Sequence, residues 1–346
     1  MKIDWTQVKR ILVVKLRSIG DTVLATPSLL ALKRFLPDAE IDILLEDWVA
    51  PVLDGFEGVK VITVGKGSAD RLRTAIQLRR RKYDLAVNMH GGTSATLLTF
   101  ASGATHRIGS GNNQFSFLYN HLLTSSLDFW KQETAHSAEQ QLALLGFVGV
   151  PVEDRPKTKL YVTDAAQQSI DDRLSPFIPH PSSLALIHPS TLFATKQWSP
   201  ENFARTAEFL TEKGFQVVTI AAKNECEVLE NLKRESGVPV ITFDDLTLPE
   251  ITALASKAKI FVGNDSGIAH IAAAVQTPSV VVFGSSNRNH WRPWTDAPNE
   301  IVFREFACQP CPGYSCEVYG EPRCIQEIPP SAVFTALERV LSVSNS

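Results

Sequence analysis

The stretch that decides the fold is ILVVKLRSIGDTVLATPSLLALKRFLPDAEIDIL, residues 11–44. It opens and closes with apolar runs, and between them apolar residues recur with the spacing of a helix. Because both runs are continuously apolar rather than alternating, they predict neighbouring strands of a parallel sheet that is covered on both faces. Parallel strands need a crossover connection, so the stretch predicts a strand, a helix and a second strand.

Similar apolar runs extend this pattern into two series along the chain. The first series predicts strands at residues 10–16, 40–46, 59–64 and 83–89. The second predicts strands at residues 184–189, 215–222, 239–243, 258–263 and 279–284. A Pro-rich stretch at 173–183 separates the two series and predicts a linker. The sequence thus predicts the α/β class, with two doubly wound, Rossmann-like domains whose parallel sheets face each other across a cleft.

Helical signals fit between the strands of the second series. In residues 199–214, Ser199 is a predicted N-cap, Pro200 suits the first helical position and Gly214 predicts the end of the helix. A further, Ala-rich helix is predicted from about Ile268 to Val275.

Composition is that of a soluble globular protein, because 44% of the residues are hydrophobic and 21% are charged. No apolar run is long enough for a transmembrane segment, and the N-terminus lacks the features of a signal peptide. We therefore expect a cytoplasmic protein whose five cysteines are reduced thiols or metal ligands.

Charge is unevenly distributed along the chain. Residues 1–160 hold 20 basic and 16 acidic residues, whereas the remainder holds 14 and 21. Much of the basic excess lies in residues 71–84. A basic half suits an anionic partner such as a phosphorylated glycolipid at a membrane surface, although a solvated helix face explains this stretch equally well. Nucleic acid is not expected as a partner, because no aromatic residues are interleaved with the arginines.

Polar residues directly after strands are candidates for a site, because ligands of such sheets bind at the carboxyl ends of the strands. Gly20 and Asp21 follow the first predicted strand, where Asp21 is either a helix cap or a catalytic carboxylate. After the strand at 184–189, Ser190, Thr191 and Lys196 supply two hydroxyls and an ammonium, which together suit an anion.

Two further segments follow strands of the second series. Ser266 and Gly267 offer free backbone N–H groups to a diphosphate, and His270 lies one turn further along the same helix. Asp265 would repel phosphate, so we expect it to cap the helix or to accept hydrogen bonds from sugar hydroxyls. Glu225 or Glu227 is placed to bind a ribose. GxGxxG, P-loop and GxSxG motifs are absent from the sequence.

Taken together, these segments resemble glycosyltransferase family 9, the ADP-heptose:lipopolysaccharide heptosyltransferases, of the heptosyltransferase II kind. The resemblance covers nearly the whole chain. It rests on residues 11–44, on IHPSTLFATKQWSPENFARTAEFL (187–210), and on VGNDSGIAHIAAAVQTPSVVVFGSS (262–286) followed by WRPW.

The resemblance implies a GT-B fold in which the two domains bind different substrates. Residues 1–175 would bind the acceptor and residues 176–329 the ADP-sugar donor, while a last helix at 330–346 would return toward the N-terminal domain. The implied reaction moves a heptose from ADP-heptose to a sugar of the lipopolysaccharide inner core, with inversion at the anomeric carbon. The acceptor would be a core precursor at the inner membrane surface, to which the enzyme would bind peripherally.

The resemblance also implies roles for single residues. Asp21 matches the proposed general base and Lys196 the diphosphate-binding lysine. The matches to the donor site are Ser190, Thr191, Asp265, Ser266, Gly267, His270 and Glu225, with Glu227 as the alternative to Glu225. The expected acceptor contacts are Gly20, His90 and Asn112, the last two in the predicted loops 90–100 and 110–121. The sequence has no DxD motif, so we expect catalysis that requires no metal cofactor.

Four cysteines form a separate motif: Cys308, Cys311, Cys316 and Cys324 lie in one short segment rich in Pro and Gly. Four thiols that open with C-x-x-C predict a structural zinc or iron–sulfur site, and the alternative is a group of reduced thiols in a loop.

Two other functions compete with the expected one. The first is a family-9 transferase that uses another nucleotide sugar or acceptor, since specificity lies in variable loops. The second is a noncatalytic protein that binds sugar nucleotides, which the presence of both Asp21 and Lys196 disfavours.

Overall fold

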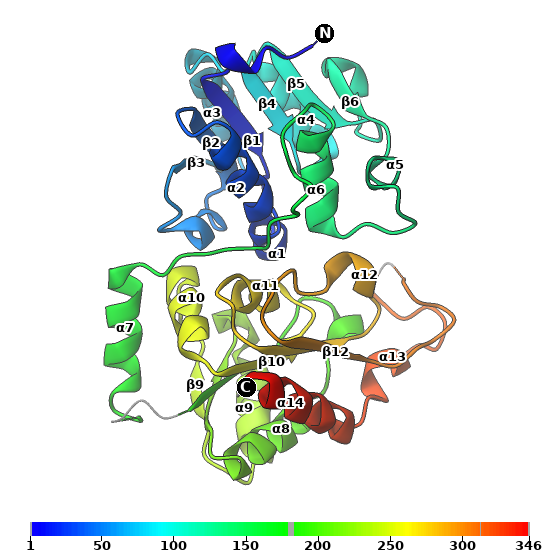
Figure 1. Cartoon of the computed structure of the whole chain (residues 1–346). Coiled ribbons are helices and arrows are strands. Elements are labelled where there is room, and N and C mark those ends of the chain that lie inside the picture. The colour runs from blue at the N-terminus through cyan, green and yellow to red at the C-terminus, as the bar shows by residue number, and fades with distance from the viewer. Residues whose placement is uncertain (1, 179–182, 312, 345–346) are drawn as a thin grey trace. The chain divides into compact units, whose positions relative to one another are not determined.

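The computed structural model describes residues 2–178, 183–311 and 313–344. Its chain divides into two compact units, Met1–Thr158 and Lys159–Ser346. Each unit is built on a six-stranded, wholly parallel sheet with helices packed around it (Figure 1). The predicted α/β class with two doubly wound units is thus confirmed.

The first sheet has the strand order β3-β2-β1-β4-β5-β6. Its strands are β1 (Arg10–Val14), β2 (Glu40–Glu46), β3 (Val59–Val64), β4 (Leu85–Asn88), β5 (His106–Ser110) and β6 (His121–Leu123). The helices are α1 (Ile19–Val23), α2 (Thr26–Phe35), α3 (Ser68–Arg80), α4 (Gly92–Ala101), α5 (Ser126–Trp130) and α6 (Ser137–Gly146). β1 lies between β2 and β4, where Val13 is in register with Ile43 and Val87.

Both faces of the central strand β1 are buried, as its continuous apolar run predicts. Ile11, Leu12, Val13 and Val14 have no exposed surface. Successive side chains of a strand point to opposite faces, so Leu12 and Val14 share one face. There they form a core with Leu78 of α3 and with Ala95 and Leu98 of α4.

The second sheet has the order β12-β11-β10-β7-β8-β9. Its strands are β7 (Leu184–His188), β8 (Gln216–Ile220), β9 (Ile241–Phe243), β10 (Ile260–Asn264), β11 (Ser279–Phe283) and β12 (Asn299–Phe303). The helices are α7 (Asp164–Leu174), α8 (Pro200–Glu212), α9 (Cys226–Glu235), α10 (Leu248–Lys257), α11 (Gly267–Ala274), α12 (Arg288–Trp291), α13 (Arg323–Gln326) and α14 (Pro330–Ser344). None of the helices in the described part of the chain is both long and apolar enough to cross a membrane.

The start of α8 follows the predicted pattern. The Ser199 hydroxyl accepts a hydrogen bond from the backbone N–H of Asn202 at 3.3 Å, and Pro200 occupies the first helical position. Gly214 follows the helix with φ +86°, a conformation that favours glycine. The predicted N-cap and helix end are therefore confirmed.

Three strands escaped prediction, and one predicted loop is a helix. β5, β6 and β12 lack continuous apolar runs, and β5 reads His-Arg-Ile-Gly-Ser. The predicted loop at 90–100 is wrong, because residues 92–101 form α4. Its threonines obscured the helical spacing in the sequence; Thr96 and Thr99 each bond back to a carbonyl four residues earlier in the helix.

The boundary between the two compact units lies after Thr158, whereas the sequence predicts it at residue 175. α7 packs against α10, so the unit that starts at Lys159 includes it. Of the expected linker at 173–183, residues 179–182 lie outside the described residues. The binding roles given to 1–175 and 176–329 stay predictions.

The expected C-terminal helix is present as α14. It contacts α8, β11 and β12, and Val333, Ala336, Leu337 and Val340 enter the core of the second unit. Its expected return toward the N-terminal domain stays a prediction.

Gly284, directly after β11, allows two segments of the second unit to pack closely. A Cβ atom there would overlap the carbonyl oxygen of Thr195 and would lie 3.1 Å from Cβ of Ile325. We expect Gly284→Ala to lower the free energy of unfolding by about 1–3 kcal/mol, the usual cost of overpacking. Urea denaturation of the variant and the parent protein measures this difference.

Gly237→Ala is the matched control. A Cβ atom at this position meets only the end of the flexible Glu208 side chain, 3.1 Å away, so unfolding should change by less than about 0.5 kcal/mol. Equal stability of the two variants would show that the close approach at Gly284 is not needed.

Candidate active site

Each sheet reverses its strand order at the middle. β1 and β4 are neighbours, but β2 and β5, which follow them in the chain, lie on opposite sides of the pair. β7 and β10 form the same arrangement in the second sheet. Loops that leave the carboxyl ends of such strands diverge and leave room for a ligand. Asp21 and His90 follow β1 and β4, and Ser190 and Asp265 follow β7 and β10.

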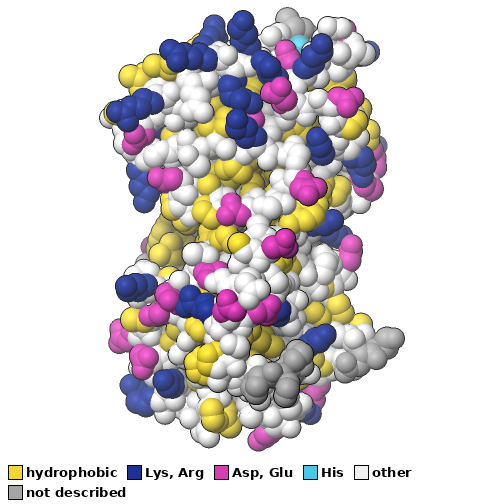
Figure 2. All heavy atoms as spheres, turned by 90° about the vertical axis from the view of Figure 1, so that its left-hand side faces the viewer, with side chains coloured by type: hydrophobic (Ala, Val, Ile, Leu, Met, Phe, Trp, Pro, Cys, Tyr) yellow, Lys and Arg dark blue, Asp and Glu magenta, His cyan; other side chains and the backbone are white. Residues whose placement is uncertain are grey.

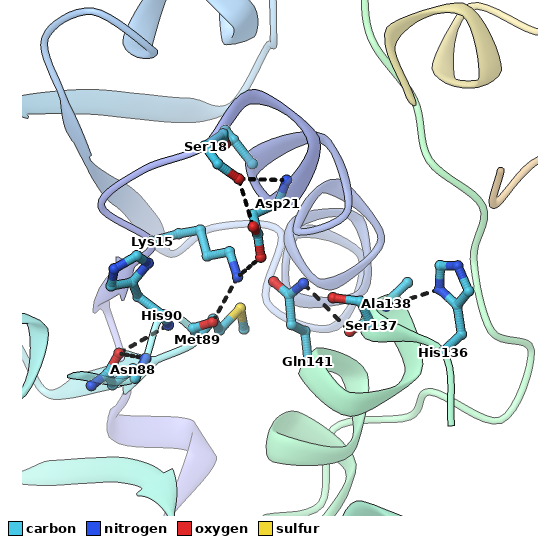
Figure 3. Close-up of polar contacts among 12 residues, drawn as sticks. Lys15, Ser18, Asp21, Asn88, Met89, His90, His136, Ser137, Ala138 and Gln141 are labelled. Atoms are coloured by element: carbon cyan, nitrogen blue, oxygen red, sulfur yellow. Dashed lines mark hydrogen bonds and ion pairs between the residues drawn. The ribbon is translucent and has the colours of Figure 1, made fainter. Parts of the chain in front are cut away.

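Asp21 lies in α1, and two neighbours hold its carboxylate (Figure 3). Lys15 Nζ lies 2.8 Å from Oδ1, and the Ser18 hydroxyl donates to Oδ2 at 2.5 Å. Ser18 is also the N-cap of α1, where its hydroxyl accepts from the backbone N–H of Asp21. The interpretation of Asp21 as a cap is therefore wrong. Its side chain remains 30% exposed.

The charge of Lys15 sets the protonation of Asp21. Burial alone would raise the pKa of Asp21, but the Lys15 ammonium and the hydrogen bonds from Lys15 and Ser18 outweigh it and hold the pKa below its usual value. Asp21 is consequently a carboxylate at neutral pH and is able to accept a proton. Lys15 is itself buried, and its ammonium also donates to the carbonyl oxygen of Met89 at 2.9 Å.

The predicted acceptor contacts lie at the same edge of the first sheet. His90 is close enough to Asp21 and Lys15 for both charges to act on it; burial and then the Lys15 charge lower its pKa, so its ring is neutral at pH 7. Asn112 is exposed in the loop after β5, and its N–H donates to the Ser110 hydroxyl at 3.3 Å. Gly20 precedes Asp21 in α1. The structure thus brings His90 beside Asp21, whereas Asn112 lies one strand further out.

Lys196, the predicted phosphate ligand, is held by an acid. It ends the short 3₁₀ helix η4 (Ala194–Lys196), and its Nζ lies 2.8 Å from Oδ2 of Asp265. The same carboxylate oxygen accepts a hydrogen bond from the Ser286 hydroxyl. Because Ser266 is the N-cap of α11, the first role expected for Asp265, a cap of this helix, is wrong, and the second, contact with sugar hydroxyls, stays a prediction. Asp265 instead holds the Lys196 ammonium in place.

A buried histidine joins the predicted hydroxyls. His188 ends β7, and its Nε2 and Nδ1 lie 3.2 Å from the hydroxyls of Ser190 and Ser266, respectively. The Ser190 hydroxyl donates to Oε2 of Glu225 at 2.8 Å. Burial lowers the pKa of His188 to about 4, so its ring is neutral at pH 7. One hydrogen-bonded chain therefore links β7, the start of α11 and the 3₁₀ helix η5 (Lys223–Glu225).

The other four predicted residues of the second unit lie on α11, in the loop after β7 and on α9. Gly267 begins α11, and His270 lies on the same helix and is buried. The backbone N–H of Thr191 donates to Oε1 of Gln197 at 3.1 Å. Glu227 is exposed in the first turn of α9, so Glu225, which bonds to Ser190, is the better placed of the two acids.

Sequence reasoning missed Lys15, His188 and Gln141. Polar residues at the ends of otherwise apolar strands could have pointed to the first two, which lie within or next to β1 and β7. Gln141 of α6 is buried, and its side chain points to the side on which Lys15 and Asp21 lie (Figure 3). No local pattern in the sequence distinguishes it from other polar residues of a helix.

The four predicted metal ligands surround one small cavity. Cys308, Cys311, Cys316 and Cys324 all line a space of about 10 Å³. Burial, and after it the charges of the other three cysteines, raises the pKa of the Cys324 thiol. As the side chains stand, no three His, Cys, Asp or Glu residues of the described chain form a ready-made metal site.

Comparison with known proteins gives the family. The model of glycosyltransferase family 9 (heptosyltransferase) matches residues 71–320. Lipopolysaccharide heptosyltransferase 3 of Escherichia coli K12 is 28% identical over 346 residues, which cover 94% of this chain and 96% of that protein. The lipopolysaccharide core heptosyltransferase OpsX of Haemophilus influenzae is 24% identical, with 86% of each chain covered.

Two solved structures share the fold. ADP-heptose lps heptosyltransferase II of E. coli has a TM-score of 0.81 at 20% identity, over 97% of this chain and 100% of that one. The family 9 glycosyltransferase of Veillonella parvula has a TM-score of 0.83 at 19% identity, over 99% of each chain. These likenesses confirm the expected GT-B fold class. Since the family model covers most of the sequence, the chain belongs to glycosyltransferase family 9, the heptosyltransferases.

Proposed function

We propose that this enzyme transfers a heptose from ADP-heptose to a sugar of the lipopolysaccharide inner core, with inversion and without a metal ion in the chemistry. The observation that carries the proposal is the Lys196 ammonium, which pairs with Asp265 at the strand-order reversal of the second sheet, while Ser286 bonds to the same carboxylate. Its neighbours in sequence and space are hydroxyls and the N-terminus of α11, a set of groups that suits a diphosphate.

The donor side of the reaction belongs to the second unit in this proposal. Lys196 and the backbone N–H groups of Ser266 and Gly267 would stabilise the negative charge that grows on the departing ADP. Glu225 would accept hydrogen bonds from the ribose hydroxyls. The remaining predicted donor contacts are Ser190, Thr191, Asp265 and His270. Metal independence rests on the presence of Lys196 and on a sequence that has no DxD motif.

The acceptor side belongs to the first unit. A sugar hydroxyl is a poor nucleophile, so the direct displacement that inversion requires needs a base to take its proton as the new bond forms. Asp21 is a partly exposed carboxylate beside neutral His90, which fits this role. Gly20, His90 and Asn112 would contact the acceptor sugar.

A lipopolysaccharide precursor would bring the enzyme to the cytoplasmic surface of the inner membrane. The basic balance of residues 1–160 supports this part of the proposal. Figure 2 shows Lys and Arg side chains spread over the face of the first unit that it presents. Such charges favour binding near anionic lipid or a phosphorylated core sugar.

Titration calorimetry with ADP, GDP and UDP tests the donor site. We expect ADP to bind most tightly, and we expect Lys196→Ala to weaken ADP binding about 10- to 100-fold, because a charged hydrogen bond to phosphate is lost. Lys213→Ala is the control, since Lys213 pairs with Glu338 and should leave the affinity unchanged. Preference for GDP or UDP would instead identify a family-9 transferase with another nucleotide sugar.

Replacement of the base tests the chemistry. Asp21→Asn keeps the size of the side chain but removes the proton acceptor, so kcat for heptose transfer should fall by about 10²–10⁴-fold while ADP affinity stays unchanged. Product formation from ADP-heptose and a core acceptor, followed by mass spectrometry, gives the rates. Asp38→Asn, an exposed acid at the other end of the strands, serves as the control.

The outcome separates the remaining alternatives. Full activity of Asp21→Asn would remove Asp21 from the reaction. A parent protein that binds ADP but forms no product with any acceptor would be a noncatalytic binding protein.

The dependence of kcat/KM on pH tests the role of Lys15. Lys15 holds the pKa of Asp21 below its usual value, so the active carboxylate persists to acidic pH. In Lys15→Met, burial remains and raises the pKa, so the acidic limb of the pH profile should move to higher pH. An unmoved acidic limb would mean that Asp21 is not the group that titrates there.

A further inference from the structure

The segment between β12 and α13 lacks regular structure. The described residues of 304–322 form no helix or strand; Cys308, Cys311 and Cys316 lie in this segment, and Cys324 follows it in α13. Irregular segments of this length are uncommon in compact domains unless they serve a function. A cross-link through bound metal is one way in which such a segment is fixed.

The four cysteines lie around one cavity although they are spread over residues 308–324. All four line the same cavity of about 10 Å³, a size that suits one water molecule or one metal ion. They are free thiols in the structure. Zinc and iron both bind four thiolates, which makes this donor set a suitable one. As the side chains stand, no three of these thiols form a metal site, so metal binding requires the side chains to move into the cavity.

The same segment is tied to the loops of the candidate donor site. Gln309 Nε2 donates to the carbonyl oxygen of Gly284 at 2.6 Å, and the N–H of Cys311 donates to that of Ser285 at 3.0 Å. The Thr195 hydroxyl donates to the carbonyl oxygen of Gly313 and accepts from the Ser285 hydroxyl at 3.0 Å. Thr195 and Ser285 also line the cysteine cavity.

These contacts join the cysteines to the charges described above. Thr195 immediately precedes Lys196, and Ser285 immediately precedes Ser286, which bonds to Asp265. A rigid cysteine segment would therefore restrain both ends of the Lys196–Asp265 pair.

We propose that Cys308, Cys311, Cys316 and Cys324 bind one thiophilic metal ion, zinc or iron, and that this site positions the turns that carry Lys196 and Ser286. The metal would have a structural role, away from the reacting atoms. Metal binding stands independently of the proposed function, whereas the effect on the nucleotide site rests on it.

Titration of reduced, metal-free protein with Co²⁺ tests the site. Bound to four thiolates, Co²⁺ gives sulfur-to-metal charge-transfer bands, and we expect them to saturate at one equivalent and to disappear when Zn²⁺ is added. Cys226→Ser, which replaces the one cysteine that is not among the four proposed ligands, should bind as the parent protein does. Cys316→Ser should bind Co²⁺ at least about 100-fold more weakly.

Elemental analysis of protein that was purified without a chelator then identifies the metal that the protein carries. The proposal is overturned if the reduced parent protein shows no charge-transfer band, or if Cys316→Ser binds Co²⁺ as tightly as the parent. Circular dichroism checks that the variants are folded. If Cys316→Ser is misfolded, the Co²⁺ titrations of the parent protein and of Cys226→Ser test the proposal instead.

ADP titration of metal-loaded and metal-free protein tests the positioning effect. We expect removal of the metal to weaken ADP binding about tenfold and to lower Tm. Equal ADP affinity in both forms would refute the positioning role while the Co²⁺ result stands. Failure of the metal-loaded protein to bind ADP would count against the proposed function instead.

Discussion

The reversal of strand order at the middle of each sheet is the constraint on which the rest of the structure depends. A parallel sheet must send each strand through a crossover, and crossovers from two adjacent central strands run to opposite sides. The loops that leave β1 and β4, or β7 and β10, are thereby forced apart. Side chains and backbone N–H groups of those loops are not used in strand pairing, so in both units they are available to bind a polar ligand.

The charges at these places are paired before any substrate arrives. Lys15 holds Asp21, and Asp265 holds Lys196, each at 2.8 Å. A buried charge without a partner would be costly, so the pairs allow the fold to keep reactive groups in fixed positions. The same pairing makes Asp21 less reactive as a base, because the Lys15 ammonium lowers the pKa of its carboxyl group. In the proposed reaction, a substrate diphosphate would have to compete with Asp265 for the ammonium of Lys196.

Much of this arrangement could be predicted from the sequence, for identifiable reasons. The central strands are buried on both faces, so runs such as residues 10–14 are visible without any structure. Edge strands such as β6 and β12 are not distinctive, because their burial depends on neighbours that are distant in the chain. Asp21 and Lys196 stand in motifs of fixed spacing. The position of His188 and Lys15 at strand ends is visible in the sequence, but their roles are not, since these come from contacts with Ser266 and Asp21.

The neutral ring of His188 fixes the direction of a whole chain of hydrogen bonds. Ser190 has one hydroxyl proton, and it is directed to Glu225, so Nε2 of His188 must carry the proton that the Ser190 oxygen accepts. Nδ1 is then an acceptor, and the Ser266 hydroxyl must donate to it. Both serine protons are thus engaged, one by Glu225 and the other by His188. In the proposed reaction, Ser266 would have to rotate away from the ring, or Ser190 release Glu225, before its hydroxyl could donate to phosphate, so the direction of this hydrogen-bonded chain would oppose phosphate binding until one of these bonds breaks.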